Sequence, residues 1–586
     1  MAAVKPPAAM YAKSIVRRLI DDRIPDDLPA DLHPVLRRTY RARQVYSLQE
    51  LDRSFARLLP PTQLKDIDRA VLLLIEMLQT RGRILVVADF DADGATSCAL
   101  VVRALREMGA AHVEYLVPNR FEYGYGLTPE IVALAAEREP DLIITVDNGI
   151  SSIEGVAAAR ARGMRVLITD HHLPGPQLPQ ADAMVNPNQP GDAFPSKQLA
   201  GVGVAFYVMA ALRARLRASG WFAREHIPEP NLARWLDLVA LGTVADLVPL
   251  DHNNRILVAQ GLARIRAGRV AEGIRALASV SGRTCARLTA SDLGFCIAPR
   301  LNAAGRLSDM SLGIECLLTD DPDRALAAAA ELDALNRERR TIEAQMQQQA
   351  MAAVQSLHLG AAALPRGLCL YDASWHQGVI GLVAARVKEQ IHRPVIAFAP
   401  AGEDEIKGSA RSIPGLHIRD VLDAVAARHP GLLTRFGGHA MAAGLSLPRV
   451  HFDRFRQAFD DEVSRIVSDD DLQGRVLTDG ELADDDLNVD LAELLRSAGP
   501  WGQSFPEPLF DGVFDVHACN VVGEQHVKLL LSQQGRKRVE AIGFRMAADG
   551  APPAWRRIHV AYRLDVNEYR GTRAPQLVLE HVAPLA

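Results

Sequence analysis

The chain has 586 residues, a formal net charge of −5, 48% hydrophobic residues and 23% charged residues. This composition is typical of globular proteins, and the length exceeds what one hydrophobic core supports, so we expect three or four domains. Six scattered cysteines without C-x-x-C spacing argue against a disulfide framework and a thiolate zinc site. They favour a cytoplasmic location, and the lack of any window of about 18 uninterrupted apolar residues argues against a membrane span.

The first half of the chain changes character near residue 76. Residues 1–75 are predicted to be helical, whereas short apolar runs alternate with amphipathic stretches over 76–315. The predicted strands are 84–88, 112–117, 141–146, 165–169 and, more weakly, 183–185. The predicted helices between them are about 96–108, 128–138 and 152–162. Strand–helix–strand alternation predicts an α/β fold with a doubly wound parallel sheet.

Three further segments follow. Residues 316–358 form a predicted connector whose helix, about 322–357, has no Gly or Pro after Pro322. A coiled-coil dimer seam is an alternative, but its heptads are poor and we expect a monomer. Residues 359–466 predict a second α/β domain with strands near 367–371 and 394–399. Acidic residues at 468–490 predict a solvated boundary, and five short β-like runs within 467–586 predict an OB-fold-like barrel.

Residues 89–97 read DFDADGATS and place Asp89, Asp91 and Asp93 close together. Neighbouring carboxylates disfavour each other's ionisation, and a bound cation is the simplest explanation. The calcium loop of an EF-hand also begins D-x-D-x-D-G, but it needs a preceding helix and a glutamate at position twelve, where this chain has Leu100. The EF-hand is therefore excluded. Gly94 is expected to turn the chain into a helix that begins near residue 96.

Polar residues also follow the later predicted strands. Asp147 follows 141–146, and Asp170, His171 and His172 follow 165–169, while Asp246 ends an apolar stretch in GTVADLVPL. Parallel sheets bind ligands at the carboxyl ends of their strands. Carboxylates with histidine suit manganese or magnesium, and this set exceeds the needs of one ion. Two ions about 3.5–4 Å apart, bridged by Asp147, would favour hydrolysis of phosphoesters or phosphoanhydrides.

Longer motifs carry a resemblance to known families. DFDADGATS, VDNGI, TDHH and TVADLVPL resemble, in that order, the four motifs of the DHH phosphoesterase superfamily. From about residue 45 onward the chain is similar to the RecJ family of bacterial single-strand-specific 5′→3′ exonucleases. The motifs are PNRFEYGYGL (118–127), IAPRLNAAGRL (297–307), WHQGVIGLVAARV (375–387), GSARSI (408–413) and RFGGHAMAAG (435–444). The chain departs from the usual glycine at Ala410 and Phe436.

The resemblance implies roles for individual residues around two divalent ions, with Mn²⁺ preferred and Mg²⁺ possible. The implied metal ligands, with Asp147 bridging, are Asp91, Asp93, Asp147, His171 and Asp246. Asp89 would bind or orient the first ion. Asp170 would hold His171 in position. His172 would contact the scissile phosphate, stabilising charge or acting as a general acid, so the catalytic residues would be His172, Asp147 and His171.

The resemblance assigns residues 76–315 to a DHH catalytic domain and residues 359–466 to a DHHA1 substrate-binding domain. The implied phosphate and DNA contacts are Arg120, Arg300, Asn302, Arg306, His376, Ser409, Arg411 and His439. In the barrel, a mixture of cations with an aromatic residue suits a path for a single strand. These residues are Lys528, Arg536, Lys537, Arg538, Arg556, Arg557, Tyr569 and Arg570.

The resemblance implies an exonuclease that releases 5′-mononucleotides from single-stranded DNA in repair and recombination, working with a helicase and a single-strand-binding protein. One alternative is a DHH phosphatase of short oligonucleotides, cyclic dinucleotides or pyrophosphate, although a small substrate needs neither the barrel nor the long connector. Another is a DNA-binding scaffold without activity, although every ligand position is filled in this sequence.

Overall fold

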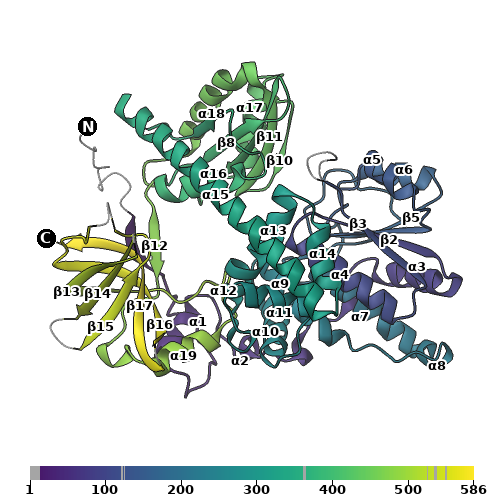
Figure 1. Ribbon diagram of the computed structural model, residues 1–586, viewed down its shortest axis with the longest axis horizontal. Coiled ribbons are helices and arrows are strands. Elements are labelled where there is room, and N and C mark those ends of the chain that lie inside the picture. The colour runs from purple at the N-terminus through teal and green to yellow at the C-terminus, as the bar shows by residue number, and fades with distance from the viewer. Residues whose placement is uncertain are drawn as a thin grey trace.

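The computed structural model describes residues 13–119, 123, 126–360, 364–523, 525–533, 537–547, 551–569 and 571–585. Within these ranges we find three folded parts joined by a long helix (Figure 1). No helix in the described ranges combines the length and the apolar character needed to cross a lipid bilayer.

The first domain contains the predicted doubly wound sheet. Its five parallel strands lie in the order β3-β2-β4-β5-β6. Their bounds are β2 Arg83–Ala88, β3 His112–Leu116, β4 Leu142–Val146, β5 Arg165–Thr169 and β6 Ala183–Val185. The predicted strands are confirmed to within one residue at each end. Strand β4, with the sequence LIITV, is buried along its whole length, as expected for a parallel strand that is covered on both faces.

Helices cover both faces of this sheet (Figure 1). One layer holds α5 (Pro129–Ala136) and α6 (Ile153–Ala161), and the other holds α3 (Ile67–Thr80), α4 (Ala92–Glu107) and α7 (Gly201–Ala218). Helix α4 begins at Ala92, four residues before the predicted start. The remaining helices of this domain are α8 (Trp221–Arg224), α9 (Leu236–Ala245), α10 (His252–Arg266), α11 (Glu272–Val280), α12 (Ala290–Asp292), α13 (Ala298–Leu307) and α14 (Ser311–Leu318).

The predicted connector is one helix, α15 (Pro322–Gly360). Ala325 and Leu332 in its first half belong to the core of the first domain. Met346 and Val354 in its second half belong to a core formed with the second domain. Its apolar positions therefore pack within the chain, along two successive domains, and do not form a coiled-coil seam.

The second domain has a mixed sheet in the order β10-β11-β9-β8-β7. Its strands are β7 (Leu368–Tyr371), β8 (Val395–Pro400), β9 (Glu405–Arg411), β10 (Arg435–Gly438) and β11 (Ala442–Pro448). Its helices are α16 (Ile380–Ile391), α17 (Ile418–Arg428) and α18 (Phe452–Ile466). The two strands predicted here, near 367–371 and 394–399, are confirmed as β7 and β8.

The C-terminal part is the predicted barrel. Five strands close in the order β13-β14-β15-β17-β16, which leaves no open sheet edge. They are β13 (Phe510–Val522), β14 (His526–Ser532), β15 (Arg538–Gly543), β16 (Arg557–Tyr569) and β17 (Thr572–Leu585). Helix α19 (Val489–Ala498) packs beside β16 and β17.

The N-terminal segment corrects two predictions. It contains helices α1 (Pro34–Arg41) and α2 (Leu48–Leu51), but residues 14–17 form a strand, so it is not wholly helical. This strand, β1 (Ser14–Arg17), pairs in parallel with β12 (Arg475–Thr478). The acidic segment 468–490 is therefore not a solvated boundary throughout. It contains β12, and the carboxylate of Asp479 is fully buried.

Arg43 and Asp479 form a buried ion pair that ties the N-terminal segment to the C-terminal part. Nη1 and Nη2 of Arg43 donate to the two carboxylate oxygens of Asp479 at 2.8 and 2.9 Å. The exposed fractions of the two side chains are 1% and 0%. The guanidinium also lies over the ring of Trp501, 5.3 Å from its centroid.

Replacing Arg43 with Ala should lower the free energy of unfolding by about 3 kcal/mol, because it leaves the buried Asp479 carboxylate with only the longer contact to Nε of Arg18, at 3.6 Å. The matched control is Arg23→Ala, which removes a similar two-bond contact with Asp21 at the surface, where the Arg23 side chain is 90% exposed. That control should leave the stability close to that of wild type, because solvent screens an exposed pair. Urea denaturation of both variants measures the difference, and equal effects would contradict the prediction.

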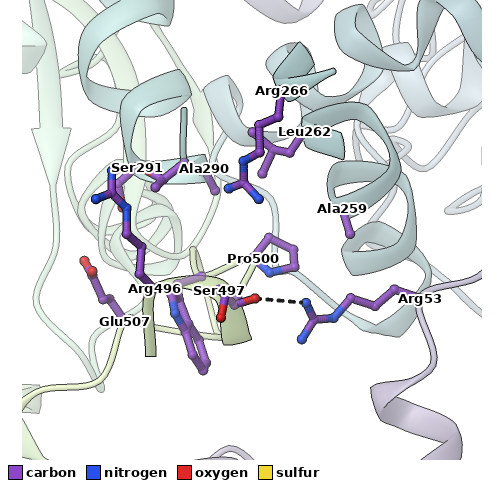
Figure 2. A pocket seen from close by; sticks show the side chains of 13 residues that line it. Arg53, Ala259, Leu262, Arg266, Ala290, Ser291, Arg496, Ser497, Pro500 and Glu507 are labelled. Atoms are coloured by element: carbon purple, nitrogen blue, oxygen red, sulfur yellow. Dashed lines mark hydrogen bonds between the residues drawn. The ribbon is translucent and has the colours of Figure 1, made fainter. Parts of the chain in front are cut away.

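A cavity lies between the first domain and the C-terminal part (Figure 2). It has a volume of about 110 Å³ and is lined by residues of α10, α12 and α19 and by the loop that follows α19. The side chains of Arg53, Arg266 and Arg496 approach it from different sides (Figure 2). None of its lining residues among the described part of the chain is a predicted metal ligand, so the cavity is separate from the acidic cluster described next.

Candidate metal centre at the carboxyl edge of the first sheet

The predicted acids meet where the connections of the first sheet change direction. Strand β2 lies between β3 and β4. The chain therefore runs from β2 to β3 on one side, and then crosses to β4 on the other side of β2. Ligands bind at such a position in doubly wound sheets. The acids at 89, 91 and 93 follow β2, and Asp147 follows β4.

Three side chains from separate elements come within contact distance here. Nε2 of His171, which follows β5, lies 3.2 Å from Oδ1 of Asp147. The same nitrogen lies 3.3 Å from Oδ2 of Asp246, the residue that ends α9. Among the described residues, this nitrogen has no hydrogen-bond partner although it is buried. A buried nitrogen placed between two carboxylates is suited to a metal ion.

The potential ligand atoms form overlapping groups, each within 4.8 Å. The first group is Asp89, Asp91 and Asp147, and the second is Asp93, His171 and Asp246. Asp147 and His171 also occur together in a third group, with His172. The residues predicted as metal ligands therefore lie close together in the structure. Their groups provide enough donors for two ions.

Burial and mutual repulsion dominate the electrostatics of this cluster. Burial, followed by the charges of Asp93 and Asp91, raises the pKa of Asp147 well above its usual value. Burial and the same neighbours raise the pKa of Asp246. Burial and Asp91 raise the pKa of Asp93 to about 7. Divalent cations would relieve this repulsion, so the donor set and its charge both fit Mn²⁺ or Mg²⁺.

The histidine in the cluster is suited to coordination. Burial, followed by the positive charge of His172, lowers the pKa of His171 to about 4. The ring is therefore neutral at physiological pH, which is the protonation state that metal ions require of histidine.

Chelation of divalent metal should lower the melting temperature of the protein by several degrees, and saturating Mn²⁺ should restore it. A ligand that binds only the folded state at 100 times its dissociation constant stabilises that state by about 2.7 kcal/mol. Differential scanning fluorimetry with EDTA and then with Mn²⁺ measures the shift. Sodium chloride at matched ionic strength is the control, and an equal shift with sodium chloride would contradict specific metal binding.

The start of α4 fixes the first two acids of the cluster. Asp91 is the N-cap of α4, and its Oδ1 accepts from the amides of Asp93 and Gly94 at 2.9 and 3.0 Å. Gly94 therefore lies within the first turn of α4. The prediction that it turns the chain into a helix that begins near residue 96 is wrong. The absent side chain of Gly94 serves close packing, because a Cβ there would overlap the backbone of Asp89.

Helix α7 holds Asp93 from the opposite side. The amides of Gly201 and Val202 at the N-terminus of α7 donate to Oδ2 and Oδ1 of Asp93 at 2.6 and 2.9 Å. A Cβ on Gly201 would lie 2.7 Å from both Cβ and Oδ1 of Asp147. A Cβ on Gly242 would lie 2.8 Å from Oδ1 of Asp93. Sequence reasoning missed both glycines, because nothing local shows that a carboxylate lies against them.

The carboxylate of Asp170 orients His172, which corrects the prediction that it holds the ring of His171. Oδ1 of Asp170 lies 2.8 Å from Nδ1 of His172, and it contacts His171 through the backbone amide at 2.7 Å. Burial would raise the pKa of Asp170, but the hydrogen bond and charge of His172 lower it below its usual value. An ionised carboxylate can only accept, so Nδ1 of His172 carries a proton.

His172 is charged and faces the second domain. Burial would lower its pKa, but the hydrogen bond and charge of Asp170, followed by Asp246 and Asp89, raise it to about 9. The ring of His439, in the β10–β11 hairpin, stacks beside it with 6.3 Å between centroids. Burial, followed by the charge of His172, lowers the pKa of His439. The two domains therefore meet over the metal cluster.

Two of the predicted phosphate contacts of the second domain, Ser409 and Arg411, lie together on β9. Nη1 of Arg411 donates to Oγ of Ser409 at 3.0 Å and to the carbonyl of Ala410 at 2.8 Å. A Cβ on Gly381, in the first turn of α16, would lie 2.8 Å from Nη2 of Arg411 and 2.9 Å from Oγ of Ser409. A guanidinium and a hydroxyl beside a helix N-terminus are suited to binding an anion.

The other predicted DNA contacts have structural partners. Oδ1 of Asn302 accepts from the amide of Ala92 and so supports the start of α4. Arg306 donates to the carbonyl of Gly378, and the amide of Gly378 donates to Nδ1 of His376, at the joint between the two domains. Arg300 is engaged by Asp333 of α15 at 2.8 Å. Arg120 lies outside the described residues.

Two of the predicted cations of the barrel lie near acids, and Nζ of Lys537 donates to the carbonyl of Leu487 at 3.0 Å. Lys528 pairs with Glu540 at 2.9 Å, and Arg557 lies 3.9 Å from Asp515. Arg536 and Arg570 lie outside the described residues, as does the side chain of Tyr569. A DNA path on the barrel therefore stays a prediction.

Comparisons with known proteins agree with this architecture. Residues 83–243 match the model of the DHH family, N-terminal domain. Residues 362–465 match the DHHA1 domain, and residues 478–581 match the RecJ OB domain.

Similarity to individual proteins extends over nearly the whole chain. The chain is 56% identical to the single-stranded-DNA-specific exonuclease RecJ of Dickeya dadantii over 97% of this chain and 98% of the relative. It is 52% identical to the protein of that name from Escherichia coli, over 97% of this chain and 99% of the relative. The crystal structure of RecJ in complex with Mn²⁺ from Thermus thermophilus superposes with a TM-score of 0.76 at 31% identity, covering 94% of this chain and 76% of that one. The protein therefore belongs to the RecJ family.

Proposed function

We propose that the protein is a metal-dependent exonuclease that hydrolyses single-stranded DNA from the 5′ end and releases 5′-mononucleotides. One observation carries the proposal. The acids and histidines of the four DHH motifs form one buried cluster at the carboxyl edge of the sheet, in a chain that is more than half identical to curated single-stranded-DNA-specific exonucleases.

Two divalent ions would be held by this cluster. The proposed ligands, with Asp147 shared between the ions, are Asp89, Asp91, Asp93, Asp147, His171 and Asp246. When bound, such ions supply the positive charge that activates water and stabilises the oxygens of a phosphoryl group during displacement. RecJ of Thermus thermophilus has been crystallised with Mn²⁺ and with Mg²⁺, which supports either ion as the cofactor.

His172 would stabilise charge on the scissile phosphate. Its Nδ1 is occupied by Asp170, so Nε2 is the nitrogen that can donate to a phosphate oxygen. The raised pKa of His172, about 9, keeps it protonated for this purpose. A positioned donor of this kind stabilises negative charge that develops in the transition state.

The second domain would recognise the end of the strand. Arg411 and Ser409 lie beside the N-terminus of α16, and His439 faces His172 across the joint. A guanidinium binds a terminal phosphate through two parallel hydrogen bonds, which supplies a physical basis for starting at a 5′ end.

A phosphatase of small substrates is supported less well, because it has no need of a closed barrel that shares a continuous core with the first domain. We further propose that the enzyme acts as a cytoplasmic monomer in DNA repair and recombination. Its six cysteines are unpaired, as expected in a reducing compartment. Because the substrate is single-stranded, a helicase that separates duplexes and a single-strand-binding protein that coats the product are its natural partners.

End-labelled DNA tests the proposal. The protein is incubated with Mn²⁺ and with single- or double-stranded DNA that carries the label at either end. We expect mononucleotides to be released first from the 5′ end of single strands. Equal attack on blunt duplexes, first release from the 3′ end, or hydrolysis of pyrophosphate alone would overturn it.

A further inference from the structure

An aromatic side chain is strongly exposed in a turn that contacts α9, the helix that ends at Asp246. Phe295 is 81% exposed, more than any other phenylalanine among the exposed large hydrophobic residues of the described chain. It lies in a π-helical turn, η5 (Leu293–Ile297), between α12 and α13. The π-helical turns found in proteins occur frequently at functional sites, because the additional residue changes the direction in which side chains point.

This turn packs against the helix that delivers a metal ligand. A Cβ on Gly294 would lie 3.2 Å from Cγ1 of Val244, which precedes Asp246 by two residues in the chain. Leu247, which follows Asp246, is 66% exposed and has φ of 59°. A bulky residue rarely adopts this left-handed conformation, and strained residues of this kind cluster at active sites.

The same turn continues toward the barrel. Asp292, next to η5, forms an ion pair with Arg283 at 3.1 Å. The hydrogen bond with the Cys296 side chain is the largest cause that raises the pKa of Arg283, and the charge of Asp565 on β16 raises it further. Arg287 pairs with Glu568 of the same strand. The turn η5 contacts α9 and α12, and these two helices stand between the first sheet and the barrel in Figure 1.

We infer that Phe295 is a stacking platform for a DNA base on the strand that runs between the metal centre and the barrel, with Leu247 as an apolar neighbour of that path. This inference rests on the proposed function. An aromatic ring stacks on any of the four bases, so such a contact holds a strand without selecting its sequence. It also adds affinity that does not depend on charge, beside Arg283 and Arg287, which are already paired with acids.

Substitutions at Phe295 test the contact directly. Affinity for a fluorescently labelled single strand is measured by anisotropy with EDTA present, so that no cleavage occurs. Phe295→Ala and Phe295→Leu should weaken binding by about 5- to 100-fold, whereas Phe295→Trp should retain wild-type affinity. The matched control is Val450→Ala, which trims a side chain that is 85% exposed at a 3₁₀ turn of the second domain. Because Phe295 and Val450 are exposed, each variant should keep the wild-type melting temperature.

Strands with a single abasic site give a readout that a structural role of Phe295 would not produce. The abasic site is moved along the strand one position at a time. At one position, the abasic site should weaken binding to the wild-type protein by the same factor as the Phe295→Ala substitution weakens binding to an intact strand. The abasic site at that position should not weaken binding to the Phe295→Ala variant, because both changes remove the same contact.

The inference is overturned if Phe295→Ala binds like wild type, or if the abasic profiles of the two proteins coincide. Both results leave the proposed function intact as long as the wild-type protein degrades ordinary single strands. Conversely, a wild-type protein that binds strands with a Phe295-dependent abasic position, but cleaves none, would support the stacking contact and overturn the proposed nuclease activity.

Discussion

Replacing Asp147 with Asn is expected to reduce cleavage of single-stranded DNA by on the order of a thousand-fold or more, while binding of the strand in EDTA is retained. The change removes the charge of a carboxylate that belongs to two of the three groups of potential ligands. Asn is the better choice than Ala, because residue 147 has φ of 62°, a conformation that Asn adopts readily and that costs Ala about 1–2 kcal/mol.

Asp237→Asn is the matched control for this experiment. Asp237 is as buried as Asp147, and its carboxylate accepts from the amides of Leu238 and Ala271 outside the metal cluster. Burial raises the pKa of Asp237 to about 6, as burial raises the pKa of the cluster acids, but Asp237 belongs to none of the groups of potential metal ligands. The control should cleave like wild type. Sustained degradation by Asp147→Asn would show that the chemistry takes place elsewhere.

Replacing Gly201 with Ala is expected to lower the turnover number by on the order of 100-fold, although residue 201 has no side chain to take part in catalysis. The new Cβ would lie 2.7 Å from Oδ1 of Asp147, closer than non-bonded atoms approach. The amide of the same residue holds Asp93 at 2.6 Å, so both carboxylates must move. Misplacement of reacting groups by about 1 Å can cost a factor of this size.

Gly203→Ala provides the control two residues along the same helix. A Cβ there would first meet Cδ2 of Leu199 at 3.1 Å, the end of a flexible side chain that can adjust. Turnover and the thermal shift with Mn²⁺ should both be close to wild type in this variant, whereas Gly201→Ala should lose most of each. If the two variants behave alike, the fit of α7 against the metal ligands is not important for activity.

The sequence predicted those parts of the fold that depend on local pattern. Strands β2, β4 and β5 appear as continuous apolar runs because parallel strands are buried on both faces. The polar residues directly after each strand then had to lie at one edge of the sheet, and so the metal cluster was predictable as well. The early start of α4 is also predictable, since Asp91 is a typical N-cap residue as well as a candidate metal ligand.

Other features depend on contacts that no local pattern carries. Which of the adjacent rings, His171 or His172, faces Asp170 is decided by side-chain conformation. The need for glycine at position 201 arises only when α7 lies against Asp147. The pairing of β1 with β12 was missed because four-residue strands give little signal, and their nearby ion pair joins residues 494 positions apart.

The pairing of β1 with β12 has a consequence for how the chain folds during its synthesis. Strand β1 is synthesised well before its partner β12 and before Asp511, whose carboxylate accepts from Arg17. Domains released earlier can fold as they appear, since folding during translation proceeds from the N-terminus. Strand β1 must instead stay unpaired until β12 has been synthesised. Chains that stop short of β12 would therefore expose that edge, and they would be natural targets for chaperones and proteases.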